Sequence, residues 1–74
     1  MLNQVILIGR LVKKPELKES DKKVSYIKAT IAVQSDFKNK EGNYDTEFFE
    51  FTAFGKIAEN TARYCEKGSL LNIV

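Results

Sequence analysis

Apolar and polar residues alternate along much of the chain with the period of two that is typical of β-strands solvated on one face. The clearest case is segment 46–55, where Phe49 and Phe51 share one face and Phe48 and Phe54 share the other. Phe49, Phe51 and Ala53 make the first face an ordinary apolar one, which is expected to line a core. The second face also carries polar residues, so it should meet water although it holds two aromatic rings.

Similar patterning divides the rest of the chain into short elements. The expected elements are a strand over 3–12, a polar loop over 13–23, a strand over 24–35, a long hairpin loop over 36–45, the strand just described, a helix over 57–66 and the start of a further strand over 69–74. This is the order of an OB-fold, a five-stranded Greek-key barrel with one helix between strands three and four. The pattern therefore predicts one mainly β domain over 1–74, apparently truncated before the last strand of the barrel.

The first expected strand differs from the others because its run Val5–Ile8 is apolar on both faces. A small domain of one chain cannot cover both faces, so a second copy of the chain is expected to cover the outer one. The pattern leaves open whether Ile6 or Leu7 points outward. Gly9 interrupts the run and indicates a bulge or a sharp bend, as at a barrel corner.

In the expected helix, apolar spacing predicts a buried stripe formed by Ile57, Thr61, Tyr64 and Cys65. Gly68 is placed to end the helix, with the preceding lysine near the negative end of the helix dipole.

Composition narrows the possible functions. The 74 residues include one cysteine and no histidine, which excludes a disulfide framework and zinc sites of the usual kind, and no cofactor is expected. No leader pattern or long apolar run occurs, so we expect a cytoplasmic protein without membrane contact. An enzyme is not expected, because no nucleophile lies beside a visible base and Glu47 and Glu50 alternate to opposite faces. The net charge of +2 is too small to predict a nucleic-acid partner by itself.

Exposed aromatic rings beside lysines suggest where such a partner could bind. Rings spaced along a solvated sheet can stack unpaired bases, although a second sheet, helix or subunit could cover them instead. The hairpin loop adds Phe37 and Tyr44 beside Lys38 and Lys40, which could clamp a nucleic-acid strand. The alternative is that the two loop rings pack across the hairpin and steady it. Lys28 is expected on the outer face of the strand over 24–35.

Several short motifs, in order, resemble the N-terminal part of bacterial-type single-stranded DNA-binding proteins. They are Met1–Leu11, Pro15–Leu17, Ala32–Val33, Thr46–Phe48, Phe54–Lys56 with Ala58–Glu59, and Tyr64 followed by Lys67–Ser69. The resemblance covers nearly the whole chain. It implies an OB-fold, self-association as a homodimer or homotetramer, and sequence-tolerant binding of single-stranded DNA in replication, recombination and repair.

The resemblance also implies roles for individual residues. The stacking positions of the family fall on Phe37, Phe48 and Phe54, where relatives often have tryptophan, and the phosphate-contacting positions fall on Lys56, Lys67 and Arg10. Lys28, Lys38 and Lys40 complete the candidate binding set, and Tyr64 is expected in the core.

Two departures from the family pattern are visible. Glu50 shares the face of the stacking rings and would repel phosphate at close range, and the last strand and the acidic partner-recruiting tail are absent from this chain. The alternative function is a protein-interaction OB module, such as a primosome accessory subunit, whose aromatic face binds a partner protein.

Overall fold

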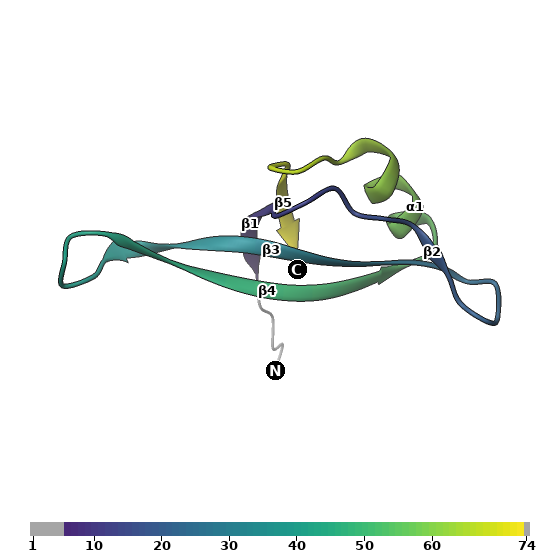
Figure 1. Cartoon of the computed structure of the whole chain (residues 1–74), viewed down its shortest axis with the longest axis horizontal. Coiled ribbons are helices and arrows are strands. Elements are labelled where there is room, and N and C mark those ends of the chain that lie inside the picture. Colours follow the sequence, from purple (N-terminus) through teal and green to yellow (C-terminus); the bar gives the residue numbers. More distant parts are fainter. Residues whose placement is uncertain (1–5, 74) are drawn as a thin grey trace.

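The computed structural model describes residues 6–73 and is mainly β. Its elements are β1 (Leu7–Leu11), β2 (Lys18–Glu19), β3 (Ser25–Lys38), β4 (Tyr44–Phe54), α1 (Gly55–Tyr64) and β5 (Leu70–Ile73). Figure 1 shows a long β3–β4 ribbon, with α1, β5 and the segment that joins β1 to β2 gathered on one side of it. The expected order of strands around a single helix is confirmed, with the addition of the short β2.

Strand β3 is the centre of a curled antiparallel sheet. Both β2 and β1 pair with one edge of β3, β4 pairs with the other edge, and β5 pairs with β1. Within residues 6–73, β4 and β5 each have one neighbouring strand, so the sheet is an open half-barrel of OB type. This agrees with the predicted fold class, an OB-fold that lacks its closing strand.

The core lies on the face of β3 and β4 that α1 covers, called here the inner face. Its buried members are Leu11, Ile27, Ala29, Ile31 and Ala58. Half-buried apolar side chains pack against this core, and they include Leu7, Val33, Phe49, Phe51, Cys65, Leu71 and Ile73. The predicted inner faces of β3 and β4 are therefore confirmed.

The β3–β4 hairpin is longer than the sequence pattern indicated. Lys38 pairs with Tyr44, so the loop spans 39–43 rather than 36–45, and a register irregularity lies between Gln34 and Lys38. Asn39 closes the turn because its Oδ1 accepts hydrogen bonds from the backbone N–H groups of Glu41 (2.9 Å) and Asn43 (3.0 Å). An amide side chain that satisfies backbone donors in this way stabilises a tight turn without further residues.

Strand β2 lies inside the segment expected to be a loop. It pairs with the start of β3 through a tight turn, in which the Ser20 N–H donates to the Val24 carbonyl at 2.9 Å. Lys23 has a φ of 61° in this turn, a conformation unusual for a residue with a long side chain. A two-residue strand shows no alternation, so the sequence pattern could not indicate it.

Gly9 has a different role from the bulge or bend expected of it. It pairs in regular register with Leu71 of β5. A Cβ atom at this position would lie 2.6 Å from the carbonyl oxygen of Ala32 on β3. Glycine is therefore required because the backbones of β1 and β3 approach closely here.

The buried stripe of α1 is also different from the expected one. Ala58 is fully buried and Thr61 and Cys65 are half-buried, whereas Ile57 and Tyr64 are 70% and 71% exposed. The helix contacts β3 and β4 through its small residues, which allow a close approach to the sheet. The expectation that Tyr64 packs in the core is wrong.

The backbone carbonyls at the C-terminal end of α1 accept hydrogen bonds from a lysine distant in the sequence, and no glycine ends the helix as expected. Cys65 is the C-cap, and the Lys14 Nζ donates to the carbonyls of Ala62 (3.2 Å) and Cys65 (3.1 Å). The same ammonium pairs with Glu66 at 3.1 Å. A cation at this position balances the negative end of the helix dipole. Gly68, with a φ of 88°, belongs to the following turn instead.

Candidate nucleic-acid interface

The face of β3 and β4 opposite α1, called here the outer face, carries the two predicted stacking rings. Phe48 is 66% exposed and Phe54 is 61% exposed. They lie six residues apart on one strand, a separation of about 20 Å at the rise of a β-strand. Within residues 6–73, neither a helix nor a second sheet covers them, so the alternative of a covered face is not met by this part of the chain.

The two rings have different neighbours across the sheet. Phe54 lies opposite Tyr26, and the ring centroids are 6.2 Å apart with the planes tilted by 39°. Such aromatic pairs are favourable, so Tyr26 helps to orient the Phe54 ring. Phe48 lies opposite Ala32, which leaves its ring faces unobstructed.

Lysines line the surface between the rings. A cavity of about 480 Å³ is lined by Lys13, Lys18, Lys28, Ala29, Thr30, Glu50, Phe51 and Thr52. A second hollow of about 400 Å³ continues from Lys28 to Tyr26 and Phe54. Ammonium groups and threonine hydroxyls, which line this surface together with the Glu50 carboxylate, are donors of the kind that phosphate oxygens accept from.

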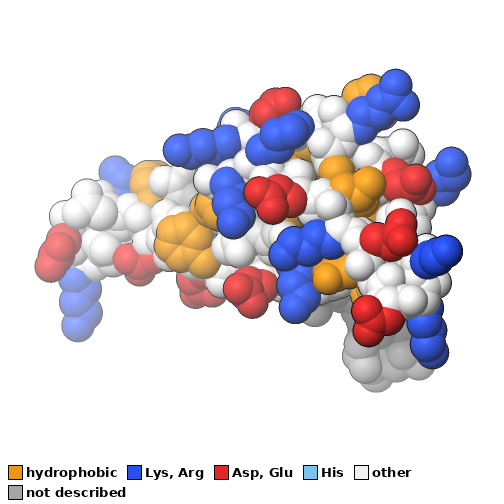
Figure 2. All heavy atoms as spheres, turned by 45° about the vertical axis from the view of Figure 1, so that its right-hand side comes forward, with side chains coloured by type: hydrophobic (Ala, Val, Ile, Leu, Met, Phe, Trp, Pro, Cys, Tyr) orange, Lys and Arg blue, Asp and Glu red, His pale blue; other side chains and the backbone are white. Residues whose placement is uncertain are grey.

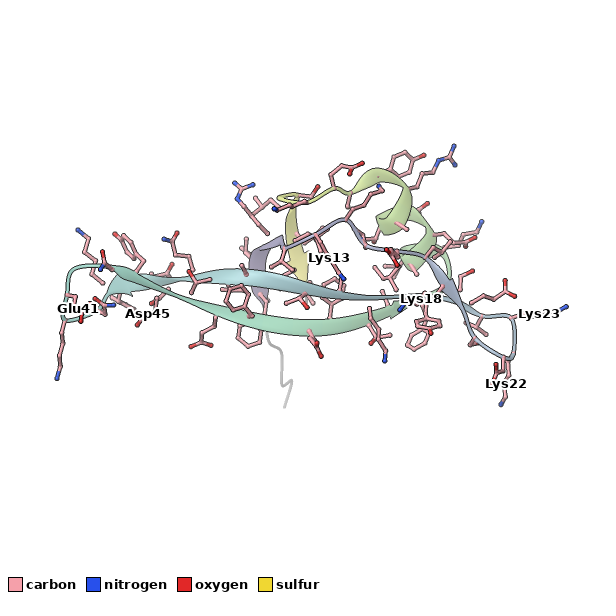
Figure 3. The ribbon with its side chains drawn as sticks, in the orientation of Figure 1. Lys13, Lys18, Lys22, Lys23, Glu41 and Asp45 are labelled. Carbon is pink, nitrogen blue, oxygen red and sulfur yellow. The ribbon has the colours of Figure 1, made fainter. Side chains whose placement is uncertain are left out.

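Lys13 and Lys18 were missed by the sequence reasoning, which placed both in a featureless polar loop. Figure 3 shows them on the segment that runs along β3, with Lys22 and Lys23 at the turn beyond β2. Lys18 reaches the outer face because β2 pairs Lys18 with Tyr26. Lys13 and Lys18 come from the segment between β1 and β3 and Lys28 comes from β3 itself, and only the tertiary structure brings the three to one cavity.

Arg10 lies on the outer face beside the Phe48 position. The register places Leu70, Arg10, Ala32 and Phe48 in one row across β5, β1, β3 and β4. Its Nη1 donates to the Gly68 carbonyl at 2.9 Å, which holds the side chain toward β5. Two strand spacings, about 10 Å, separate the Arg10 and Phe48 backbones.

The remaining predicted site residues are exposed but distributed over other parts of the surface. Phe37 (81% exposed), Lys38 and Lys40 lie on the projecting end of the β3–β4 hairpin, where the Lys38 Nζ is 5.8 Å from the centroid of the Tyr44 ring. Of the two loop rings, Tyr44 is thus engaged by a cation across the hairpin and Phe37 is free to stack. Lys56 lies in the first turn of α1, and Lys67 lies in the turn before β5.

The charge on this surface is mixed. Figure 2 shows Lys and Arg side chains spread over the body of the molecule, with Asp and Glu side chains interspersed. Glu41 and Asp45 lie at the hairpin tip, away from the lysine-lined cavity (Figure 3). Electrostatic attraction is therefore moderate, and the aromatic rings must contribute much of any affinity.

No metal centre or membrane span is present in the described part of the chain. Residues 6–73 contain no group of three or more potential acidic, cysteine or histidine ligands that could hold a metal ion. The same residues include no helix long and apolar enough to cross a bilayer.

Comparison with known proteins gives a consistent result. The model of the family described as "Single-strand binding protein family" matches residues 2–74. The chain is 42% identical over 73 residues to single-stranded DNA-binding protein B of Bacillus subtilis, and this match covers 99% of this chain and 65% of that relative. It is 40% identical over 73 residues to single-stranded DNA-binding protein 3 of Listeria innocua and to single-stranded DNA-binding protein 1 of Staphylococcus aureus. These matches cover 99% of this chain and 46% and 47% of the respective relatives. The chain therefore spans between about half and two thirds of the length of these relatives, and it belongs to the single-strand binding protein family.

Proposed function

We propose that this chain binds single-stranded DNA with little dependence on sequence. The observation that carries the proposal is the pair of exposed rings, Phe48 and Phe54, on a solvated sheet face beside a cavity lined by three lysines. Bases are available for stacking on such rings only when they are unpaired, since a duplex buries its base faces. The named relatives are single-stranded DNA-binding proteins, which supports the same function for the part that this chain represents.

In the proposed mechanism, binding involves no chemical step. Lys13, Lys18 and Lys28 attract the phosphate backbone and release its counterions, which lowers the logarithm of affinity by about 0.7 per contacted phosphate for each tenfold rise in salt. Successive bases then stack on Phe48 and Phe54, and each stacked base contributes roughly 1–3 kcal/mol. Arg10, Lys56 and Lys67 extend the phosphate path beyond these rings. Phe37, Lys38 and Lys40 extend it along the hairpin.

A titration distinguishes this function from binding a partner protein. Fluorescently labelled oligo(dT) and a duplex of equal length are titrated with the protein, and anisotropy is measured at several salt concentrations. The single strand should bind more tightly at every salt concentration, because only it offers base faces to the rings. Equal affinity for the two ligands would refute the stacking mechanism and would favour a protein-interaction module.

We also propose that the chain self-associates, as a homodimer or homotetramer. Ile6, Ile8 and Leu70 are 57%, 56% and 60% exposed, and Ile8 and Leu70 also line a hollow of about 330 Å³. In addition, strand pairing of β1 with β3 is limited to Arg10 and Leu11, so the first part of β1 keeps an open edge. An apolar surface next to an unpaired strand edge is what a second copy of the chain can cover about a two-fold axis.

A further inference from the structure

Glu50 is an acidic residue placed between the two stacking rings. It lies on the outer face opposite Thr30 and lines the same cavity as Lys13, Lys18 and Lys28. Its side chain is exposed and makes no hydrogen bond or ion pair with residues 6–73. A carboxylate here weakens phosphate binding. Because no hydrogen bond or ion pair with residues 6–73 uses its oxygens, they are available to a different ligand group.

The position of Glu50 brings it within reach of a base rather than of the backbone alone. Phe48 and Glu50 are two positions apart on one strand, with only Phe49 between them, so their side chains are neighbours on the same face, about 7 Å apart. A base stacked on Phe48, or the nucleotide that follows it, therefore presents an edge near the carboxylate. In a single strand, the Watson–Crick edges of the bases are free to form hydrogen bonds.

The four bases differ sharply in what they offer to a carboxylate, which can only accept hydrogen bonds. Guanine presents two adjacent donors, N1–H and N2–H₂, which match the two carboxylate oxygens. Adenine and cytosine each present one amino group beside a ring nitrogen that repels the carboxylate. Thymine presents a single N3–H between two carbonyl oxygens. Guanine is thus the best partner of Glu50 and thymine the poorest.

We propose that Glu50 creates a guanine-preferring position within an otherwise sequence-tolerant surface. The proposal rests on the proposed binding of single-stranded DNA. Stacking continues to accept every base, and the carboxylate adds a bidentate hydrogen bond only where guanine follows or occupies the Phe48 position. The lysines around the cavity keep the phosphates near a carboxylate that would otherwise repel them.

The test compares oligonucleotides of about 16 nucleotides, near the upper end of the site size of one OB fold. In each one, every third thymine of oligo(dT) is replaced by guanine, hypoxanthine or adenine, so that any binding register places a substituted base near Glu50. Hypoxanthine has a purine ring like that of guanine but lacks the N2 amino group. The ratio of the affinities for the guanine and hypoxanthine oligonucleotides therefore isolates the second hydrogen bond from the effect of stacking a larger ring.

Two variants with the same change of charge complete the design. Glu50→Thr removes the carboxylate from the outer face. Glu47→Thr removes a carboxylate from the same strand, but the Glu47 side chain lies on the other face, opposite Val33. Threonine suits a strand and is too short to make a bidentate contact. The unmodified protein and Glu47→Thr should prefer the guanine oligonucleotide to the thymine one by about fivefold, the low end of a bidentate base contact.

Glu50→Thr should lose this preference, while its affinity for oligo(dT) should rise because a repulsive charge is gone. Two affinity ratios are compared between the unmodified protein and Glu50→Thr: that of the guanine to the hypoxanthine oligonucleotide, and that of the guanine to the thymine oligonucleotide. If both ratios are the same in the two proteins, the proposal is overturned. That result would leave the proposed function intact, since all oligonucleotides would still bind. Failure of the unmodified protein to bind any single strand would instead refute the proposed function and, with it, this inference.

Discussion

Phe48 and Phe49 are adjacent in the sequence and lie on opposite faces of β4, so truncating each to alanine separates binding from stability. Phe48 is 66% exposed, and Phe49 is half-buried against the core of Leu11, Ala29 and Ile31. The two substitutions remove the same atoms from the same strand. Any difference between them therefore reports the face and not the chemistry of the change.

Phe48→Ala should weaken binding of oligo(dT) by roughly 1–3 kcal/mol, a factor of about 5 to 150, because one stacking platform is lost. About a third of its side chain is buried, and complete burial of a phenylalanine is worth roughly 1.5–3 kcal/mol, so the free energy of unfolding should fall by only about 0.5–1 kcal/mol.

Phe49→Ala should mainly destabilise the domain. A fully enclosed phenylalanine costs roughly 3–5 kcal/mol when truncated. Phe49 lies toward the open side of the half-barrel and is only half-buried, so about 2–3 kcal/mol is expected. For a domain of this size, that loss lowers the melting temperature by roughly 10–20 °C. The folded fraction should bind oligo(dT) nearly as tightly as the unmodified protein.

The assays are anisotropy of a labelled oligo(dT) and thermal unfolding followed by circular dichroism, both on the same preparations. Wild-type affinity in Phe48→Ala would refute base stacking at this position. A Phe48→Ala protein that unfolds beside a fully stable Phe49→Ala protein would show that the faces of β4 are inverted.

Four further substitutions test other parts of the structure. Ile8→Glu should lower the oligomeric state in sedimentation equilibrium because it charges the exposed outer face of β1, whereas Leu7→Glu should unfold the domain; a monomeric unmodified protein at tens of micromolar would refute the interface. Gly9→Ala should reduce stability to urea by roughly 1–3 kcal/mol, because its Cβ would lie 2.6 Å from the rigid Ala32 carbonyl oxygen, and an unchanged midpoint would contradict this packing. Lys18→Gln should reduce the slope of log affinity against log salt by about 0.7, and an unchanged slope would remove Lys18 from the phosphate path.

The sequence pattern by itself determined the faces of β3 and β4. Alternation predicts that Ile27, Ile31, Phe49 and Phe51 point inward and that Phe48 and Phe54 point outward. The burial of these side chains confirms both assignments. The reason is that a long strand with one buried face must repeat its apolar residues with a period of two. That period is evident without knowing what the strand packs against.

The helix shows where local pattern is insufficient. Helical spacing predicted a buried stripe of Ile57, Thr61, Tyr64 and Cys65. Only Thr61 and the C-cap Cys65 are half-buried, and the fully buried residue is Ala58 of the neighbouring stripe. The sequence favoured the larger residues. The sheet selected the smaller ones, because a close approach of helix and strands depends on side-chain volume at the contact, and that contact is defined only by the tertiary structure.

Tertiary structure also decided which charges act together. Lys13 and Lys18 reach the outer face only because the segment after β1 runs along β3 and forms β2, and Gly9 is required only because Ala32 lies across from it. The hydrophobic pattern does not assign Ile6 and Leu7 to faces of the sheet, since both residues are apolar. The pairing of β1 with β5 is what turns Leu7 inward. In each case, the deciding neighbour is distant in the sequence. A residue's local period shows how its strand alternates but not which remote segment will meet it.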